Sequence, residues 1–146
     1  MKKMITLLLA GGVLFQVSAA ELNWLTDLPQ AEARAKAENK LVLLDFTGSD
    51  WCPGCILFHD EAALSPKFAA YAKASLVLVQ VDFPDKKPQS DALKAANDAL
   101  QKKYDVEGFP TFLLLNQDGK ELGRQTGYSA NGMDDLITQL GKLSKK

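Results

Sequence analysis

Three short runs of almost continuous apolar residues constrain the fold more than any other feature of this chain. They are LVLLDF (Leu41 to Phe46), SLVLVQVDF (Ser75 to Phe83) and TFLLLN (Thr111 to Asn116). Runs of this length, rich in Val, Leu and Phe and without alternation, indicate strands that are buried on both faces. Such strands need helices above and below their sheet. The sequence therefore predicts an α/β fold built on a central sheet.

Helix and turn signals around these runs complete the predicted order of elements. Helices are expected over residues 28–39 (capped by Asp27), 52–63, a short stretch from Ser65-Pro66, 91–104 (capped by Ser90 or Asp91) and 132–143. The stretch from Asn116 to Gly119 predicts a hairpin turn into KELGRQTG, a polar stretch expected to form an edge strand. Helical crossovers followed by a hairpin predict a central mixed four-stranded sheet flanked by helices, with an extra N-terminal helix.

The first twenty residues have the pattern of a cleaved secretory signal. Lys2 and Lys3 precede an apolar run from Met4 to Phe15, and small residues at Ala19 and Ala20 suit a signal peptidase. This run is too short to cross a bilayer, which needs about 20 apolar residues. The sequence therefore predicts export, with the bacterial periplasm as the destination, and a mature domain over residues 21–146.

Charge and length limit the classes of function that remain. Loss of Lys2 and Lys3 changes the formal net charge from −1 to −3. No basic stripe suggests a nucleic-acid partner, and the KLSKK ending is typical of a solvated tail. The mature chain is long enough for one domain with its own core. Nothing in it indicates an added dimerisation domain, so a monomer is expected.

Cys52 and Cys55 are the only cysteines in the chain, and they stand within four residues. Such a pair can be a structural staple, part of a metal site or a redox couple. A staple is the weakest interpretation, because closing a four-residue loop contributes only about 2 kcal/mol against about 4.7 kcal/mol for 100 residues.

A metal site needs more ligands than these two sulfurs. A closed zinc site has four N or S donors, so Cys52 and Cys55 would need His59 and a carboxylate such as Asp60, all on one helix. Haem attachment would need histidine directly after the second cysteine, where Ile56 stands. His59 is expected to be a helix-surface or packed neighbour rather than a ligand or a base, and no metal or bound cofactor is predicted.

A redox couple fits the predicted local structure. The loop after the first apolar run delivers Cys52 to a helix N-terminus, where free N–H groups and the helix dipole favour an anion. A fall in pKa from about 8.5 to about 7 would raise the thiolate fraction at neutral pH from about 3% to about 50%. Cys55 is expected to lie nearly one turn deeper and to be less exposed. Cys52 is therefore the predicted nucleophile and Cys55 the predicted resolving thiol.

At this point the sequence resembles a known family. The segments LVLLDFTGSDWCPGC and VEGFPTFLLLNQDGKELGRQTGY are similar to the thioredoxin superfamily. The resemblance covers residues 23–143 and is closest to small secreted disulfide oxidoreductases, including periplasmic disulfide reductases of the DsbH kind. It implies a thioredoxin fold and catalysis of thiol–disulfide exchange.

The resemblance assigns roles to residues around the cysteines. Trp51, Cys52 and Cys55 match the family's WCxxC motif, with Trp51 as either a packing residue or a substrate contact. Pro110 matches the family's cis-proline, and Phe109 beside it would offer its backbone to an extended polypeptide.

Asp45 is the one acid within the first apolar run. Related thioredoxins hold a buried aspartate here that moves the proton of the resolving cysteine. In the family the first cysteine comes six positions after this aspartate, whereas in this chain Cys52 comes seven positions after Asp45, and Gln80 stands where a lysine is often found. Asp45 is therefore either a proton-transfer group or a strand-end acid turned to solvent or to a backbone partner.

The dipeptide between the cysteines bears on the direction of electron flow. Pro53 and Gly54 have no side-chain donor, whereas strongly oxidising relatives typically have a histidine there. The sequence therefore favours an enzyme that reduces or isomerises disulfides in polypeptide or small-molecule substrates. The resemblance to the family implies that a membrane electron donor re-reduces it. A disulfide oxidant and a binding or metal-carrying module are the alternatives.

Overall fold

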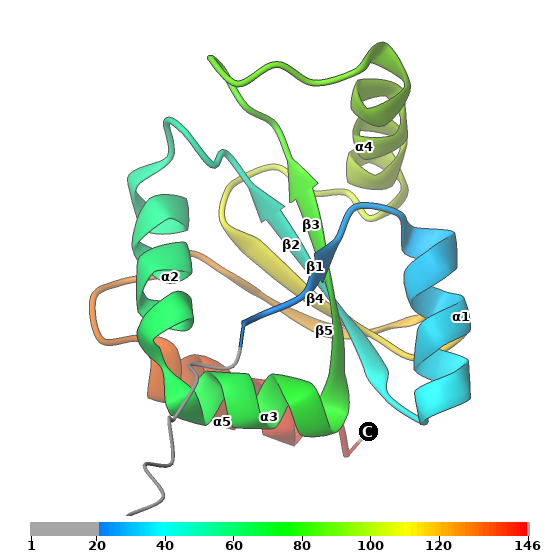
Figure 1. The fold of residues 1–146 in the computed structure, drawn as a ribbon, viewed down its shortest axis with the longest axis vertical. Coiled ribbons are helices and arrows are strands. Elements are labelled where there is room, and N and C mark those ends of the chain that lie inside the picture. The colour runs from blue at the N-terminus through cyan, green and yellow to red at the C-terminus, as the bar shows by residue number, and fades with distance from the viewer. Residues whose placement is uncertain (1–20, 146) are drawn as a thin grey trace, which may run out of the picture.

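A five-stranded sheet lies between two layers of helices in the computed structural model, which describes residues 21–145 (Figure 1). The predicted signal peptide lies outside the described residues. The α/β architecture that the apolar runs predicted is confirmed.

The elements alternate between strands and helices along the chain. The strands are β1 (Trp24–Leu25), β2 (Leu41–Thr47), β3 (Leu76–Asp82), β4 (Thr111–Leu115) and β5 (Glu121–Thr126). The helices are α1 (Leu28–Glu38), α2 (Pro53–Leu64), α3 (Pro66–Ser75), α4 (Asp91–Lys103) and α5 (Met133–Leu143). Among residues 21–145, none of these helices combines the length and apolarity needed to cross a bilayer.

The sheet has the order β1-β3-β2-β4-β5, which places β2 at its centre. β3 runs parallel to β2 and β1, whereas β4 is antiparallel to β2 and β5 is antiparallel to β4. The predicted count of four strands is corrected to five, because β1 adds a short parallel pairing at the edge beside β3. Two residues are too few to produce a periodic pattern in the sequence, which is why β1 was not predicted.

Side-chain caps fix where several helices begin. The Asp27 carboxylate accepts from the backbone N–H of Gln30 at 2.7 Å, and the Ser65 hydroxyl accepts from Phe68 at 3.1 Å. Ser90 caps α4 in the same way, at 3.2 Å from the N–H of Leu93. These bonds satisfy N–H groups that have no partner within the helix. The predicted helix starts are therefore correct to within a residue.

Each face of the sheet has its own apolar core. α1 and α4 cover one face, where alternate β2 residues such as Val42 and Leu44 point. α2, α3 and α5 cover the other face, which contains Leu43 and the fully buried Phe58 of α2 (Figure 1). The rings of Trp24, Phe68, Phe112 and Tyr128 all lie against Phe58, with centroids 4.6–6.2 Å away. Phe58 therefore anchors α2, and with it the cysteine motif at the start of α2, to the sheet.

Replacing Phe58 with alanine tests this anchoring. Phe58→Ala should lower the free energy of unfolding by about 3–5 kcal/mol, because it removes a fully buried ring and leaves a cavity. Urea unfolding followed by circular dichroism measures the change. Leu64→Ala on the same helix is the control: its side chain is 83% exposed, so a change within about 0.5 kcal/mol is expected. Equal effects of the two substitutions would contradict the proposed anchoring.

Candidate active site

The two cysteines form a disulfide at the start of α2. Their Cα atoms are 5.2 Å apart. Cys52 is the N-cap of the helix and Pro53 its first residue, where a missing N–H costs nothing. The structure therefore places the pair at the helix N-terminus, as the sequence predicted.

The environments of the two sulfurs differ. Cys52 is 5% exposed and Cys55 is fully buried, so Cys52 is the outer member of the pair. The N–H of Cys55 points to the Cys52 sulfur at 3.3 Å, and the N–H of Gly48 points to the Cys55 sulfur at 3.4 Å. Backbone donors at a helix N-terminus favour a negative charge on the group they face. The arrangement can therefore stabilise a thiolate at Cys52 when the disulfide is reduced.

The loop before β4 lies directly against the first turn of α2. The Phe109–Pro110 peptide bond is cis, as expected for this position. A Cβ atom at Gly54 would meet the Pro110 ring and the Tyr128 carbonyl at 3.3 Å, which is tighter than ordinary packing. Tyr128 also donates a hydrogen bond to Glu61 of α2. Glycine at position 54 therefore allows the cysteine motif and the Pro110 loop to approach each other closely.

An aromatic cluster borders the disulfide on the side of this loop. The Phe83 and Phe109 rings stack at 5.1 Å, and the edge of Trp51 meets Phe109 at 6.0 Å. The Trp51 indole N–H donates to the Phe83 carbonyl at 2.8 Å, yet Trp51 remains 49% exposed. Trp51 is thus both packed and accessible. Phe83 was not predicted as a site residue, because its position follows from the path of the loop after β3.

The loop between β2 and α2 is attached to the segment after β3. The Asp50 carboxylate accepts three backbone N–H groups, those of Asp85, Lys86 and Lys87, at 2.8–2.9 Å. These hydrogen bonds hold the pKa of Asp50 below its ordinary value. Ser49 also donates to Asp82 through its N–H and its hydroxyl, at 3.0 and 2.6 Å. The one-residue extension of the loop is therefore accommodated by long-range polar contacts that no local sequence pattern reveals.

Asp45 lies in the interior of β2 and is fully buried. The expectation of a strand-end acid turned to solvent is therefore wrong, because β2 continues to Thr47 and the side chain faces α2. Burial raises the pKa of Asp45, while the neighbouring His59 opposes that rise. Gln80 is its partner on β3, at the position where a lysine was noted as missing.

His59 contacts Asp45 across the interface between α2 and the sheet. The Nε2 atom of His59 is 2.8 Å from Oδ2 of Asp45, and its side chain is 24% exposed. Its ring packs on Trp24 at 5.3 Å. The prediction of a packed neighbour is correct, but the contact with Asp45 was missed. The spacing of four residues from Cys55 was the signal that placed His59 on the same helix face.

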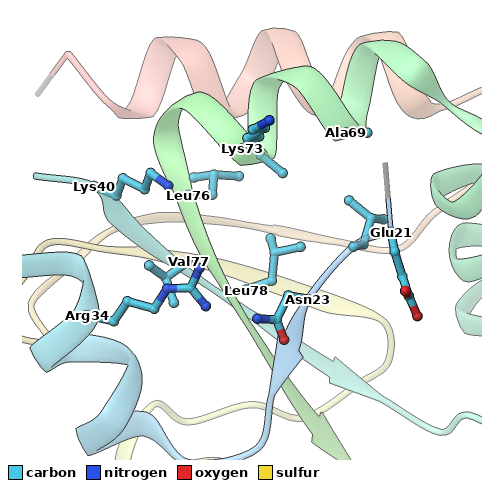
Figure 2. A pocket seen from close by; sticks show the side chains of 11 residues that line it. Glu21, Asn23, Arg34, Lys40, Ala69, Lys73, Leu76, Val77 and Leu78 are labelled. Atoms are coloured by element: carbon cyan, nitrogen blue, oxygen red, sulfur yellow. The ribbon is translucent and has the colours of Figure 1, made fainter. Parts of the chain in front are cut away.

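Residues 21–145 contain no group of three or more histidine, cysteine or acidic side chains arranged to hold a metal ion. A cavity of about 270 Å³ lies between α1, α3 and the edge of β3, away from the cysteines (Figure 2). Arg34, Lys40 and Lys73 border it, together with Glu21. Arg34 and Lys40 are both paired with Glu38. The disulfide with its surroundings is therefore the candidate active site.

Comparison with known proteins gives the family. The family profile described as a thioredoxin-like domain matches residues 28–141. The chain belongs to the thioredoxin-like family. It is 36% identical over 129 residues to the disulfide bond reductase DsbH of Chlamydia pneumoniae, a match that covers 88% of this chain and 76% of the relative.

Other relatives extend the comparison. A solved structure described as a DsbH oxidoreductase superposes with a TM-score of 0.72 at 33% identity, covering 90% of this chain and 95% of that chain. The thiol:disulfide interchange protein DsbD of Actinobacillus pleuropneumoniae is 32% identical over 75% of this chain, which spans only 18% of DsbD. A thioredoxin from Thermus thermophilus (TM-score 0.62, 23% identity) supports the fold alone. Fold, cysteine pair and relatives together identify a thiol–disulfide oxidoreductase.

Asp50 provides a test of the loop attachment. Asp50→Ala should lower the urea midpoint at pH 7, because three backbone donors lose their acceptor. The lowered pKa of Asp50 means that its stabilisation is present above its ordinary pKa of 3.8 and is lost as the pH falls through the folded value. The difference in urea midpoint between wild type and Asp50→Ala should therefore become smaller below about pH 4.

Asp85→Ala is the matched control for this experiment. It removes the same charge from the loop after β3 to which Asp50 binds, but the Asp85 side chain makes none of the hydrogen bonds found among the described residues. A decrease in urea midpoint that does not depend on pH in Asp50→Ala would contradict the assigned role of Asp50. An equal decrease in urea midpoint in Asp85→Ala would contradict it as well.

Proposed function

We propose that this chain is an exported protein-disulfide reductase of the periplasm, with a secondary capacity to isomerise disulfides. Its substrates are disulfide-containing polypeptides or small disulfides. It acts as a monomer, needs no bound cofactor and is re-reduced by a membrane electron donor. The N-terminal signal pattern supports export, and the likeness to a protein named disulfide bond reductase supports the direction.

One observation carries the proposal: a disulfide at a helix N-terminus whose outer sulfur belongs to Cys52. In the reduced enzyme, the Cys52 thiolate attacks a sulfur of the substrate disulfide and one substrate thiolate leaves. Cys55 then gives up its proton and attacks the Cys52 sulfur, which releases the second substrate thiolate. The leaving thiolates take up protons, two electrons pass to the substrate, and the Cys52–Cys55 disulfide forms.

The surface around Cys52 supports a polypeptide substrate. Pro110 and Phe109 lie beside the first turn of α2, and Trp51 presents half of its side-chain surface to solvent. An extended chain bound along Phe109 would bring its disulfide to Cys52, while Trp51 contacts its flanking side chains. The Phe83 ring stacks on the Phe109 ring and so holds it in position.

The chemistry between the cysteines supports reduction over oxidation. Pro53 and Gly54 contribute no side-chain donor to the Cys52 sulfur, which is left with the N–H of Cys55. A thiolate stabilised this modestly makes the reduced form less favoured than in strong oxidants.

Replacement of each cysteine should separate the two steps. Cys52→Ser should abolish reduction of insulin disulfides in the presence of dithiothreitol. Cys55→Ser should turn over poorly and accumulate a mixed disulfide through Cys52, visible on non-reducing gels. Ile56→Ser, at a 39% exposed neighbour on α2, is the control and should retain activity within about threefold, in line with a minor surface change.

Two results would contradict the proposed function. One is full insulin reduction by Cys52→Ser. The other is tight retention of copper or zinc on the cysteine pair without any turnover, which would favour a metal-carrying module.

The reduction potential tests the direction of electron flow. Equilibration of the Cys52–Cys55 couple with glutathione or dithiothreitol should give a value nearer to the about −270 mV of thioredoxin than to the about −120 mV of DsbA. The fraction of disulfide is measured by alkylation and mass spectrometry. A potential above about −150 mV would indicate an oxidant instead.

A further inference from the structure

Glu61 of α2 is bonded to the loop of residues 127–132, which connects β5 to α5. Its Oε1 atom accepts the backbone N–H of Asn131 at 3.0 Å, and its Oε2 atom accepts the hydroxyl of Tyr128. These two bonds hold the pKa of Glu61 below its ordinary value, because both donors favour the charged carboxylate. One α2 side chain therefore attaches the helix to a loop that lies 67–70 positions further along the chain.

The helix itself gains nothing from an acid at position 61. Glu61 lies in the last turn of α2, where the negative end of the helix dipole disfavours a carboxylate. Residues 61–64, which form that turn, include no basic side chain to offset the effect. The bonds to Tyr128 and Asn131 do give a reason for the acid, because they satisfy two donors of the 127–132 loop.

The 127–132 loop is also attached to the loop that contains the cis-proline. The N–H of Gly127 donates to the Pro110 carbonyl at 2.8 Å. Gly127 and Asn131 have positive φ angles of 85° and 61°, which glycine adopts freely and asparagine tolerates better than most residues. The backbone therefore turns sharply at both ends of the 127–132 loop, and hydrogen bonds to Pro110 and Glu61 secure the two turns.

Tyr128 brings this loop next to the cysteine motif. Its ring packs on the Phe58 ring of α2, with the centroids 5.4 Å apart. Its carbonyl oxygen lies 3.3 Å from the point that a Cβ atom at Gly54 would occupy, which is as close as the Pro110 ring. The 127–132 loop and the Pro110 loop therefore both border the dipeptide between the two cysteines.

A hollow beside Tyr128 gives this loop room for part of a ligand. Its volume is about 310 Å³, and its lining consists of residues 125–129 with Gly132 and Asp135. A polypeptide whose disulfide has reached Cys52 extends past the sulfurs and can place a flanking side chain there. A small disulfide at Cys52 has no chain with which to occupy the hollow.

We propose that Glu61 is a positioning residue for polypeptide substrates: through its bonds to Tyr128 and Asn131, it holds the 127–132 loop in the shape that receives the chain flanking the substrate disulfide. This inference rests on the proposed function, in which Cys52 attacks the disulfide of a polypeptide. Without these bonds the loop leaves this shape for part of the time. The apparent affinity for a polypeptide then falls in proportion to the fraction of molecules that keep the shape.

Two variants remove the bonds in different ways. Tyr128→Phe keeps the ring against Phe58 and removes only the hydroxyl, whereas Glu61→Ala removes the acceptors of both bonds. Each variant should raise the KM for insulin about fivefold or more, because the loop loses bonds to a charged group, and should leave kcat within about twofold of wild type. Insulin reduction in the presence of dithiothreitol gives both constants.

A small neutral disulfide separates substrate binding from the chemistry at the cysteines. The reduced protein is mixed with bis(2-hydroxyethyl) disulfide, and acid-quenched samples are analysed by mass spectrometry. Tyr128→Phe and Glu61→Ala should both react within about twofold of the wild-type rate, because the step at Cys52 is unchanged.

Two further variants are the controls. Glu61→Gln keeps an acceptor for the N–H of Asn131 and gains an amide that can donate to the Tyr128 hydroxyl. Its KM for insulin should therefore lie within about twofold of wild type. Asp60→Ala removes the same charge from the neighbouring, exposed position of α2, and it should change neither KM nor kcat.

Amide hydrogen exchange tests the Glu61 bonds without a kinetic assay. In wild type the Asn131 amide donates to Glu61, whereas the Ala130 amide donates in none of the hydrogen bonds found within residues 21–145. The Asn131 amide should therefore exchange more slowly than the Ala130 amide, and Tyr128→Phe should accelerate it. Equally fast exchange of the two amides in wild type would overturn the inference.

The kinetic results can also contradict the inference. An unchanged KM for insulin in both Tyr128→Phe and Glu61→Ala would overturn it and leave the proposed function intact. An equal loss of rate with insulin and with the small disulfide would overturn it as well, because Glu61 would then act on the cysteines. Failure of the wild type to reduce either substrate would instead overturn the proposed function.

Discussion

The junction between β2 and α2 determines where the redox chemistry takes place. The Gly48 carbonyl accepts the N–H of Cys52 at 2.9 Å, while the Gly48 N–H points to the Cys55 sulfur. This tight turn makes Cys52 the N-cap of α2 and keeps both sulfurs close to the end of the central strand β2. A Cβ atom at Gly48 would overlap the Trp51 indole in its observed position, so this turn and the placement of Trp51 depend on glycine. If the helix began at another residue, its unpaired N–H groups would face other atoms. The Cys52 thiolate would then lose the stabilisation that these groups provide.

The same junction connects the redox pair to its surroundings. Asp50 binds three N–H groups beyond β3, and Trp51 donates to the Phe83 carbonyl. These bonds fix the loop before α2 to the loop after β3, so that Phe83 is in place to stack on Phe109. The contacts that accommodate a longer loop therefore also build the aromatic border of the disulfide. The stability of the loop and the shape of the surface beside the disulfide are therefore consequences of one set of interactions.

The parts predictable from the sequence are those that local patterns determine. Apolar runs gave the three buried strands, and side-chain caps such as Asp27 and Ser65 gave helix starts. The two-residue β1 has no such pattern. The burial of Asp45 depends on whether β2 continues past it, which a single acid in an apolar run leaves open. The Asp50 contacts join residues 35–37 positions apart, and only the folded path of both loops brings them together.

Stability alone gives no reason for an acid at position 45. A buried ion pair costs desolvation energy, and apolar replacements of such pairs are often neutral or stabilising. In the proposed redox cycle, each turn must remove a proton from the Cys55 thiol, which is fully buried in the disulfide form. The Asp45 carboxylate contacts His59, whose side chain is 24% exposed, so this contact joins the buried carboxylate to the surface of α2.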